Sequence, residues 1–115
     1  MYRYNAKLDR VVDGDTIDAL VDLGFNTWKK VRIRMMGINA PESRTRDLEE
    51  KKLGLAAKAR LSELIESNDF VFTLQSHGVG KFGRCLGEIF IDEEISINQT
   101  LINEGHATEY YGGAR

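Results

Sequence analysis

The sequence has 115 residues, 42% of them hydrophobic and 30% charged, and its formal net charge is −2. This length predicts one domain over residues 1–115, large enough to fold without a disulfide or a structural metal. The single cysteine, Cys85, excludes an internal disulfide, and no apolar run is long enough to span a membrane. The negative net charge disfavours polyanionic partners unless a local cluster of cations binds them.

One such cluster occupies residues 29–34, which read K-K-V-R-I-R and carry four cations in six positions. The first residues, M-Y-R-Y-N-A-K, lack the apolar core of a signal peptide. This predicts a cytoplasmic protein, or a secreted one if a leader has been removed from the chain.

The hydrophobic pattern changes period along the chain and predicts the elements in order. Alternating apolar residues predict strands over 4–12, 16–23 and 28–38. Apolar residues three and four positions apart then predict a helix of about 15–20 residues within 47–67. Gly54 interrupts the helical pattern at a cost of about 1 kcal/mol relative to alanine, so the helix is predicted to begin near it.

The second half of the chain is predicted to contain two further strands and a second helix. The strands cover 69–75 and 84–92, and residues 76–80 form a flexible loop between them. A short helix over 95–104 follows and ends at Gly105. Three strands, a helix, two strands and a helix favour the OB-fold, a partly open five-stranded barrel. We therefore expect a mainly β or α+β domain in which two or three helices flank the barrel.

Three polar clusters stand out against this pattern. The first is D-G-D-T at 13–16, which is typical of a tight hairpin turn and also of a cation site at the end of a strand. The second is R-M-M-G-I-N-A-P-E at 34–42, and the third is K-F-G-R at 81–84. The first cluster alone leaves both interpretations open.

Together these clusters resemble the motifs of the staphylococcal-nuclease (thermonuclease) family. Those motifs are a D-G-D-T element, an arginine-bearing strand that runs into a D-x-P-E turn, and Y-G-R after a loop. The present sequence has D-G-D-T, R-M-M-G-I-N-A-P-E and F-G-R in the same order, followed by a similar tail at 98–107, N-Q-T-L-I-N-E-G-H-A. The resemblance covers nearly the whole chain and implies an OB barrel with flanking helices.

The resemblance also implies a metal site in this sequence. Asp15 and Asn39 occupy the places of two side-chain ligands to Ca²⁺, with Mg²⁺ or Mn²⁺ as other possible ions. Ala40 stands where the family supplies a backbone carbonyl, and Asp13 matches an acid beside the ligands.

The catalytic and substrate-binding positions follow from the same resemblance. Glu42 matches the acid that orients or deprotonates the attacking water, and Arg34 and Arg84 match the pair that binds the scissile phosphate. The positions that match contacts to the nucleotide and its base are Lys81, Phe82 and Tyr111. The implied activity is metal-dependent endonuclease cleavage of DNA and RNA by a monomer without a membrane partner, with little sequence specificity, a preference for single strands and a 3′-phosphate product.

Elementary chemistry suits these residue types independently of the resemblance. Hydrolysis of a phosphodiester builds negative charge on phosphoryl oxygens, which positioned arginines bind bidentately. A hard divalent cation prefers oxygen ligands and polarises the phosphoryl group. A carboxylate beside a bound water orients the water or takes its proton.

Asn39 departs from the family pattern, in which aspartate is usual. Asparagine keeps an oxygen ligand but removes one negative charge, which weakens Ca²⁺ binding. Three hypotheses follow: the enzyme works with weaker metal affinity, Asp13 or Asp18 supplies the missing charge, or the site is impaired. The third hypothesis describes an OB module that binds single-stranded nucleic acid or a protein partner without cleavage.

Four other residues with reactive or aromatic side chains are interpreted as surface or packing residues. His77 is placed in a loop and His106 at a helix end, both on the surface. Cys85 is interpreted as a small buried hydrophobic residue and Trp28 as core or strand-edge packing. One tyrosine of the 110–111 pair remains a candidate for stacking on a base.

Overall fold

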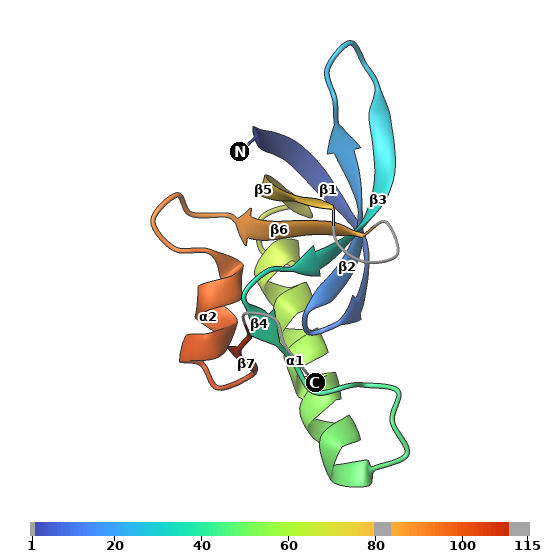
Figure 1. Ribbon diagram of the computed structural model, residues 1–115, viewed down its shortest axis with the longest axis vertical. Coiled ribbons are helices and arrows are strands. Elements are labelled where there is room, and N and C mark those ends of the chain that lie inside the picture. The colour runs from blue at the N-terminus through green and yellow to red at the C-terminus, as the bar shows by residue number, and fades with distance from the viewer. Residues whose placement is uncertain (1, 80–83, 111–115) are drawn as a thin grey trace.

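The computed structural model describes residues 2–79 and 84–110 and arranges five strands as a closed barrel (Figure 1). The order around the barrel is β1 (Tyr2–Asp13), β2 (Thr16–Asp22), β3 (Trp28–Met35), β6 (Cys85–Phe90) and β5 (Val71–Val79). Strands β3 and β6 run parallel, whereas the other neighbours are antiparallel. This mixed five-stranded barrel confirms the predicted OB-like fold.

Two helices and a small second sheet complete the described architecture. The helices are α1 (Leu48–Glu66) and α2 (Ile97–Asn103). The small sheet pairs β4 (Ile38–Asn39) with β7 (Thr108–Glu109) and so brings the end of the described chain beside the segment that follows β3. Neither helix in the part of the chain that the structure describes has the length and apolarity of a membrane span.

Strand β3 shows how side-chain alternation builds the barrel. Ile33 and Met35 are fully buried in the core, whereas Arg32 and Arg34 lie on the outer face of the strand. The core is closed by side chains from the barrel, β4 and both helices. The largest fully buried ones are Ile17, Ile33, Met35, Ile38, Leu61, Ile65, Leu74, Ile89 and Leu101. The alternation predicted for β3 is therefore confirmed.

Helix α1 begins at Leu48, six residues before the start predicted near Gly54. Its first turn is stabilised by Asp47, whose Oδ1 accepts hydrogen bonds from the backbone N–H groups of Glu49 (3.0 Å) and Glu50 (3.3 Å). Gly54 lies inside the helix and is buried. The prediction was wrong because a helix tolerates an internal glycine where close packing requires one.

Two predicted strand boundaries also differ in the structure. The strand predicted over 28–38 ends at Met35, because the chain turns at Gly37, whose φ of +82° is accessible to glycine. Strand β5 continues to Val79, so most of the predicted loop at 76–80 is strand and His77 lies within it. The apolar pattern continues past Met35 and is weak after residue 75. Hydrophobic alternation therefore did not show where β3 and β5 end.

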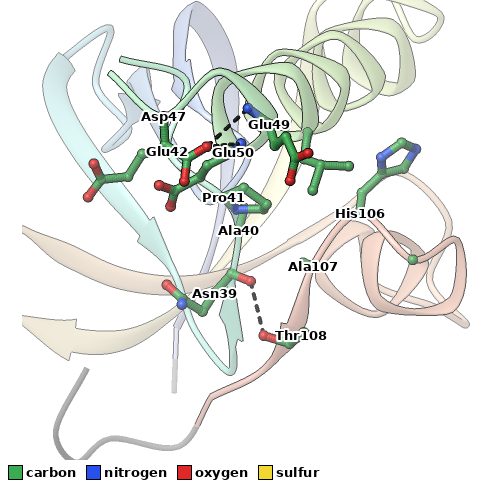
Figure 2. A pocket seen from close by; sticks show the side chains of 12 residues that line it. Asn39, Ala40, Pro41, Glu42, Asp47, Glu49, Glu50, His106, Ala107 and Thr108 are labelled. Carbon is green, nitrogen blue, oxygen red and sulfur yellow. Dashed lines mark hydrogen bonds between the residues drawn. The ribbon is translucent and has the colours of Figure 1, made fainter. Parts of the chain in front are cut away.

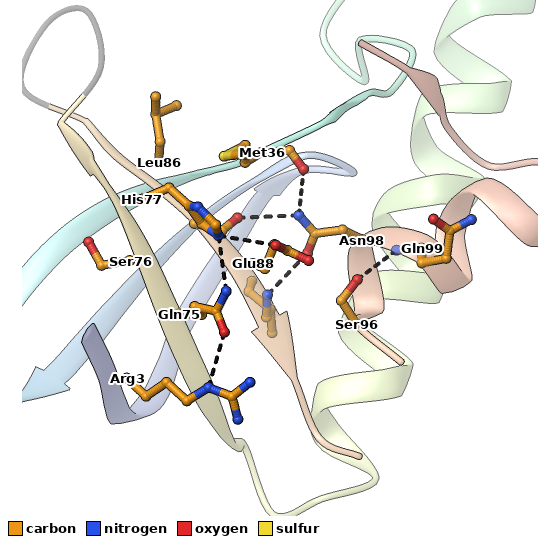
Figure 3. Close-up of polar contacts among 12 residues, drawn as sticks. Arg3, Met36, Gln75, Ser76, His77, Leu86, Glu88, Ser96, Asn98 and Gln99 are labelled. Atoms are coloured by element: carbon orange, nitrogen blue, oxygen red, sulfur yellow. Dashed lines mark hydrogen bonds and ion pairs between the residues drawn. The ribbon is translucent and has the colours of Figure 1, made fainter. Parts of the chain in front are cut away.

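Buried Asn98 connects α2 to the barrel near the end of β3 (Figure 3). Its Nδ2 donates hydrogen bonds to the carbonyl oxygens of Met36 (2.8 Å) and Gly87 (3.2 Å), and its Oδ1 accepts one from Ile89 N (3.1 Å). These three bonds satisfy the buried amide and fix the turn that leads from β3 to β4.

Candidate functional site

Asp15 lies between β1 and β2 and joins two segments that are far apart in sequence. The residue is buried, and its Oδ2 accepts a hydrogen bond from Ala40 N at 2.9 Å, across 25 residues of sequence. Its Oδ1 accepts a bond from the hydroxyl of Thr16 at 2.9 Å. The D-G-D-T turn is therefore held against the Asn-Ala-Pro-Glu segment, as the metal-site interpretation requires.

Arg34 extends from the outer face of β3 toward the place where Asp15 contacts Ala40, which is called the corner below. Its side chain is only 12% exposed, and its Nη2 lies 3.6 Å from Asp15 Oδ2. Its Nη1 donates to the Met35 carbonyl at 2.9 Å, and its Cζ lies 5.9 Å from the centre of the Tyr110 ring. These contacts hold a guanidinium in a position set before any ligand arrives, which is the condition for electrostatic catalysis.

Tyr110 is a neighbour of this site that the sequence did not single out. Its backbone N–H donates to the Gly37 carbonyl at 2.9 Å, which places its ring against Arg34. The family resemblance matched Tyr111, which lies outside the described residues, to the base contact and left Tyr110 only as a member of the tyrosine pair. Tyr110 reaches the site because the β4–β7 pairing sets the register of the last described residues against the segment after β3.

Asn39 presents an oxygen that is buried without a hydrogen-bond donor among the described residues. The orphaned atom is Oδ1, whereas the backbone carbonyl of Asn39 accepts a bond from the Thr108 hydroxyl at 3.3 Å. A buried amide oxygen without a donor costs free energy unless water or a cation approaches it. Asn39 precedes Ala40, whose backbone N–H donates to Asp15 Oδ2, so the backbone that carries this amide lies beside the Asp15 carboxylate.

The donors in this corner fit a hard cation. A carboxylate on Asp15, an amide oxygen on Asn39 and nearby backbone carbonyls are all oxygen ligands, which Ca²⁺ and Mg²⁺ prefer. Among the described residues there is no cluster of three or more His, Cys, Asp or Glu side chains arranged to hold a metal. A cation here would therefore have few anionic ligands and would depend strongly on Asp15.

Glu42 is exposed, but the backbone that carries it is tightly fixed. A Cβ atom built on Gly54 would overlap the Glu42 carbonyl and lie 2.7 Å from Ser43 N, so α1 packs directly on this turn. From the other side, buried Ser43 donates both its backbone N–H (3.2 Å) and its hydroxyl to Asp13 Oδ1. Asp13 thus holds the glutamate-bearing turn, and Gly54 leaves room for that turn.

Arg84 immediately precedes β6, the strand that runs parallel to β3. The register pairs Ile33 with Cys85 and Arg34 with Leu86. By alternation Arg84 belongs to the same outer face as Leu86 and Arg34, with Cα atoms of the two arginines roughly 8 Å apart. The parallel register therefore places Arg34 on β3 and Arg84, just before β6, on the same side of the barrel.

All three predicted substrate contacts, Lys81, Phe82 and Tyr111, lie outside the described residues.

Asp18, one candidate for the charge missing at Asn39, belongs to a different cluster. Its carboxylate accepts bonds from Arg32 Nε (2.8 Å), Arg32 Nη2 (3.1 Å) and Arg10 Nε (3.0 Å). The guanidinium of Arg32, then that of Arg10, lowers the pKa of Asp18 to about 2. The charge of Asp18 is thus balanced by these arginines, and Asp18 does not supply the charge missing at Asn39.

A cleft of about 830 Å³ opens on the helix side of the corner, as Figure 2 shows. Asn39, Ala40 and Glu42 line one wall, and the first turn of α1 and residues 105–108 line the others. The acids of the α1 end are Asp47, Glu49 and Glu50. Negative charge at a helix N-terminus is stabilising, so these three acids are explained by the helix itself. His106 also lines this cleft, at the helix end where the sequence placed it.

His77, predicted in a loop, is instead part of a polar chain on the outer face of the barrel (Figure 3). Its Nε2 lies 3.0 Å from Glu88 Oε1 and 3.3 Å from Gln75 Nε2, and Arg3 Nε donates to Gln75 Oε1 at 3.0 Å. These partners give His77 a structural role between β5 and β6.

Taken together, this region contains a guanidinium held in place at Arg34, oxygen atoms on Asp15 and Asn39 that could hold a cation, and the Glu42 carboxylate on a fixed turn. These groups are the ones that cleavage of an anionic ester requires: charge stabilisation, a Lewis acid and an acceptor for a water proton.

Comparisons with known proteins point the same way. A family model described as staphylococcal nuclease homologue matches residues 32–114. The chain is 30% identical over 110 residues to Protein ParB of Escherichia coli, covering 88% of this chain and 54% of that protein. It is 29% identical over 119 residues to a micrococcal nuclease of Shigella flexneri, covering 95% of this chain and 61% of that protein.

A further relative is Endonuclease YncB of Bacillus subtilis (strain 168), which is 30% identical over 108 residues. That match covers 93% of this chain and 48% of the relative. The chain therefore spans about half to three-fifths of the length of these three relatives.

Proposed function

We propose that this chain, which belongs to the staphylococcal nuclease homologue family, is a metal-dependent nuclease that hydrolyses phosphodiester bonds of DNA and RNA. We further propose a preference for single strands and little sequence specificity, as the family resemblance implies, because contacts to phosphate carry no sequence information. The family supports nuclease activity in general, and the finer assignments below concern this chain's own residues.

One observation carries the proposal: Asp15 contacts both Ala40 and Arg34. Through these two contacts the cation ligand, the phosphate-binding strand and the glutamate-bearing turn converge on one point. A folded barrel without this function would have no need to bury a carboxylate and an arginine together, because burial of charge is costly.

In the proposed mechanism the two arginines bind the scissile phosphate and stabilise the charge that develops on its equatorial oxygens. Arg34 is held by Asp15 and the Met35 carbonyl, so little reorganisation accompanies the reaction. Glu42, on the turn between Asp13 and Gly54, orients a water molecule and accepts its proton. Asp15, Asn39 and the Ala40 carbonyl would hold Ca²⁺, or another divalent ion, which when bound polarises the phosphoryl group.

A second candidate function is binding of single-stranded nucleic acid or a protein partner without cleavage. The observation that favours it is Asn39, because the amide leaves Asp15 as the one carboxylate ligand proposed for the cation. The two candidates differ in one measurable property, which is cleavage.

The test is cleavage of a labelled single-stranded DNA by the purified chain with Ca²⁺, Mg²⁺ or Mn²⁺, against a chelator control. Cleavage that the chelator abolishes is expected, and Glu42→Gln is expected to remove it while leaving the fold unchanged by circular dichroism. No cleavage with any of the ions, from a folded sample, would reject the nuclease and favour the binding module. Cleavage at an unchanged rate by Glu42→Gln would reject the role of the glutamate.

A further inference from the structure

The β2–β3 hairpin projects from the barrel (Figure 1), and the loop at its tip carries Phe25. Phe25 is fully exposed, and Leu23 and Trp28 beside it are 47% and 42% exposed. Phe25 and Asn26 both adopt left-handed backbone conformations, with φ of 53° and 59°. A bulky residue rarely adopts this conformation, and glycine would fit it without strain.

The tip is nonetheless a defined turn. Leu23 N donates to the Thr27 carbonyl at 2.8 Å, and Thr27 N donates to the Gly24 carbonyl at 2.9 Å. The Asp22 carboxylate accepts a bond from Gly24 N at 2.8 Å. These bonds define the loop, and the phenyl ring of Phe25 lies in solvent outside the barrel core. A strained residue that holds an apolar ring in water is more typical of a binding surface than of a structural turn.

The outer face of β1, β2 and β3 next to this tip is locally positive, although the whole protein is negative. Between the tip and Arg34 it carries the cations Lys7, Arg10, Lys30 and Arg32 against the carboxylates Asp9, Asp18 and Asp22. Four cations against three carboxylates leave an excess of one positive charge on this part of the face. A polyanion is therefore attracted to this side of the molecule.

The cations closest to the tip remain accessible. Lys30 is 67% exposed in its side chain, and its partner Asp9 lies 3.2 Å away at the surface, an ion pair weak enough to exchange for a phosphate. Lys7 Nζ lies 4.7 Å from the centre of the Trp28 ring, so a cation and an aromatic group also adjoin there. Arg32 is not among the cations proposed to bind phosphate here, because its guanidinium already donates two hydrogen bonds to Asp18.

Geometry connects the tip to the phosphate-binding corner. Trp28, Lys30 and Arg34 alternate on the same face of β3. Six residues of strand separate Trp28 from Arg34, or about 20 Å, which an extended single strand of several nucleotides covers. A strand whose scissile phosphate lies at Arg34 therefore has a direct path along β3 to the tip.

We propose that the hairpin tip is a second contact for a single-stranded nucleic-acid substrate, in which Phe25 stacks on a base and Lys30 binds a phosphate. This inference rests on the proposed function, because the substrate strand is assumed to start from the arginine pair. Exposed rings interleaved with cations are the general means by which proteins bind single strands without sequence preference. A membrane contact would need only the apolar tip, whereas here the cations continue along β3 toward Arg34.

The test is fluorescence anisotropy of labelled oligothymidylates of about 4 and about 12 nucleotides, in chelator so that no cleavage occurs. The variant is Phe25→Asn, because asparagine tolerates the left-handed conformation. We expect it to weaken binding of the longer oligonucleotide about tenfold and to leave the shorter one unchanged. The matched control is Leu48→Asn, which removes an 80% exposed apolar side chain at the start of α1. This variant is expected to bind both oligonucleotides with wild-type affinity.

Salt dependence tests the contribution of Lys30 separately. Lys30→Gln is expected to reduce the slope of log K against log salt for the longer oligonucleotide by roughly 0.7, and Lys52→Gln on α1 is expected to leave it unchanged. Wild-type affinity of Phe25→Asn for the longer oligonucleotide would overturn the proposal. So would an equal loss for both lengths, or an effect of Phe25→Asn on anionic vesicles but not on DNA.

The two proposals fail in different ways. A chain that binds the longer oligonucleotide through Phe25 but cleaves nothing with any divalent ion overturns the nuclease and leaves the tip contact standing. A chain that cleaves normally while Phe25→Asn binds and cleaves long strands like the wild type overturns the tip contact alone.

Discussion

Arg32 and Arg34 occupy the same face of β3, two residues apart, yet the barrel gives them different surroundings. Arg32 is 44% exposed in its side chain and is bound through two nitrogens by Asp18, which Arg10 shares. Arg34 is 12% exposed and lies in a corner formed by Asp15, the Met35 carbonyl and Tyr110. In the sequence both arginines belong to one basic cluster, and only the family resemblance distinguishes Arg34 from Arg32.

The difference shows what separates a structural ion pair from a functional cation. Arg32 has a carboxylate partner on the neighbouring strand at direct register, so its charge is neutralised locally. The carboxylate beside Arg34 is also bound by Ala40 N and Thr16 and lies 3.6 Å from the guanidinium, a looser contact. We infer that Arg34 keeps capacity to bind an anion while Arg32 serves the stability of the barrel.

The largest expected effect comes from replacing the two arginines separately. Arg34→Ala is expected to slow cleavage by about 10³-fold or more, because it removes a positioned donor to the transition-state phosphoryl group. Arg32→Ala is expected to keep cleavage of short substrates within a few-fold of wild type while lowering the free energy of unfolding by about 1–2 kcal/mol. Steady-state cleavage and urea unfolding measure the two quantities.

Arg84→Ala extends this test to the second strand. It is expected to lose activity to a similar extent as Arg34→Ala, with the fold unchanged by circular dichroism. If Arg32→Ala lost as much activity as Arg34→Ala, the distinction between the two arginines would be wrong. Near wild-type cleavage by Arg84→Ala would remove that residue from the mechanism.

Gly54→Ala tests how strictly the glutamate turn is positioned. A methyl group at this position would overlap the Glu42 carbonyl, so the turn must move. We expect cleavage to fall by about 10–100-fold, since a displacement of roughly 1 Å in a catalytic group has effects of this size. The readout is kcat against KM for a short substrate, and the expected loss is in kcat.

A suitable control for Gly54→Ala is Ala56→Gly, which lies on the exposed side of the same helix. It weakens the helix by about 1 kcal/mol without touching the turn. The rate of cleavage should fall in Gly54→Ala and stay at the wild-type value in Ala56→Gly. An equal effect of both substitutions would indicate that helix stability, and not the position of Glu42, limits activity.

Asn39→Asp is expected to increase the affinity of the site for Ca²⁺. A second carboxylate beside Asp15 raises the charge of the oxygen site, so Ca²⁺ binding is expected to tighten by about tenfold. Calorimetric titration of the metal measures this without reference to turnover. Unchanged or weaker Ca²⁺ binding would show that Asn39 does not contact the ion.

The smallest expected effect concerns Asp18 and its dependence on pH. Its pKa is about 2 in the folded protein and 3.8 in the reference state, so its ion pairs contribute stability above pH 4 and lose it as pH falls through 2. With the half-exposed arginines taken into account, this contribution is about 1–2 kcal/mol. Asp18→Asn should therefore be less stable than wild type at pH 7, and the difference should close between pH 4 and 2.

The matched control is Asp9→Asn, whose partner Lys30 is well exposed and whose expected effect is below about 0.5 kcal/mol. Urea unfolding of both variants across this pH range gives the comparison. A difference between Asp18→Asn and wild type that did not change with pH would contradict the assignment of the lowered pKa to the ion pairs.

Much of the fold was predictable because its information is local. Alternation in β3 and the three- and four-residue spacing in α1 identified both elements, and the order of elements identified the OB barrel. The boundaries at Met35 and Val79 were missed, since hydrophobic periodicity does not show where a strand loses its hydrogen-bonding partner. The start of α1 was missed because the packing that requires Gly54 involves a segment outside the helix.

The sequence by itself determined the barrel, the family and the residue types of the site: two arginines, an acidic turn and a glutamate after proline. The tertiary structure decided which of these groups meet. It placed Asp15 against Ala40, Asp13 against Ser43, Tyr110 against Arg34 and Asp18 against Arg32. These contacts join residues 14 to 76 positions apart, and their partners are set by strand register and helix packing rather than by any local pattern in the sequence.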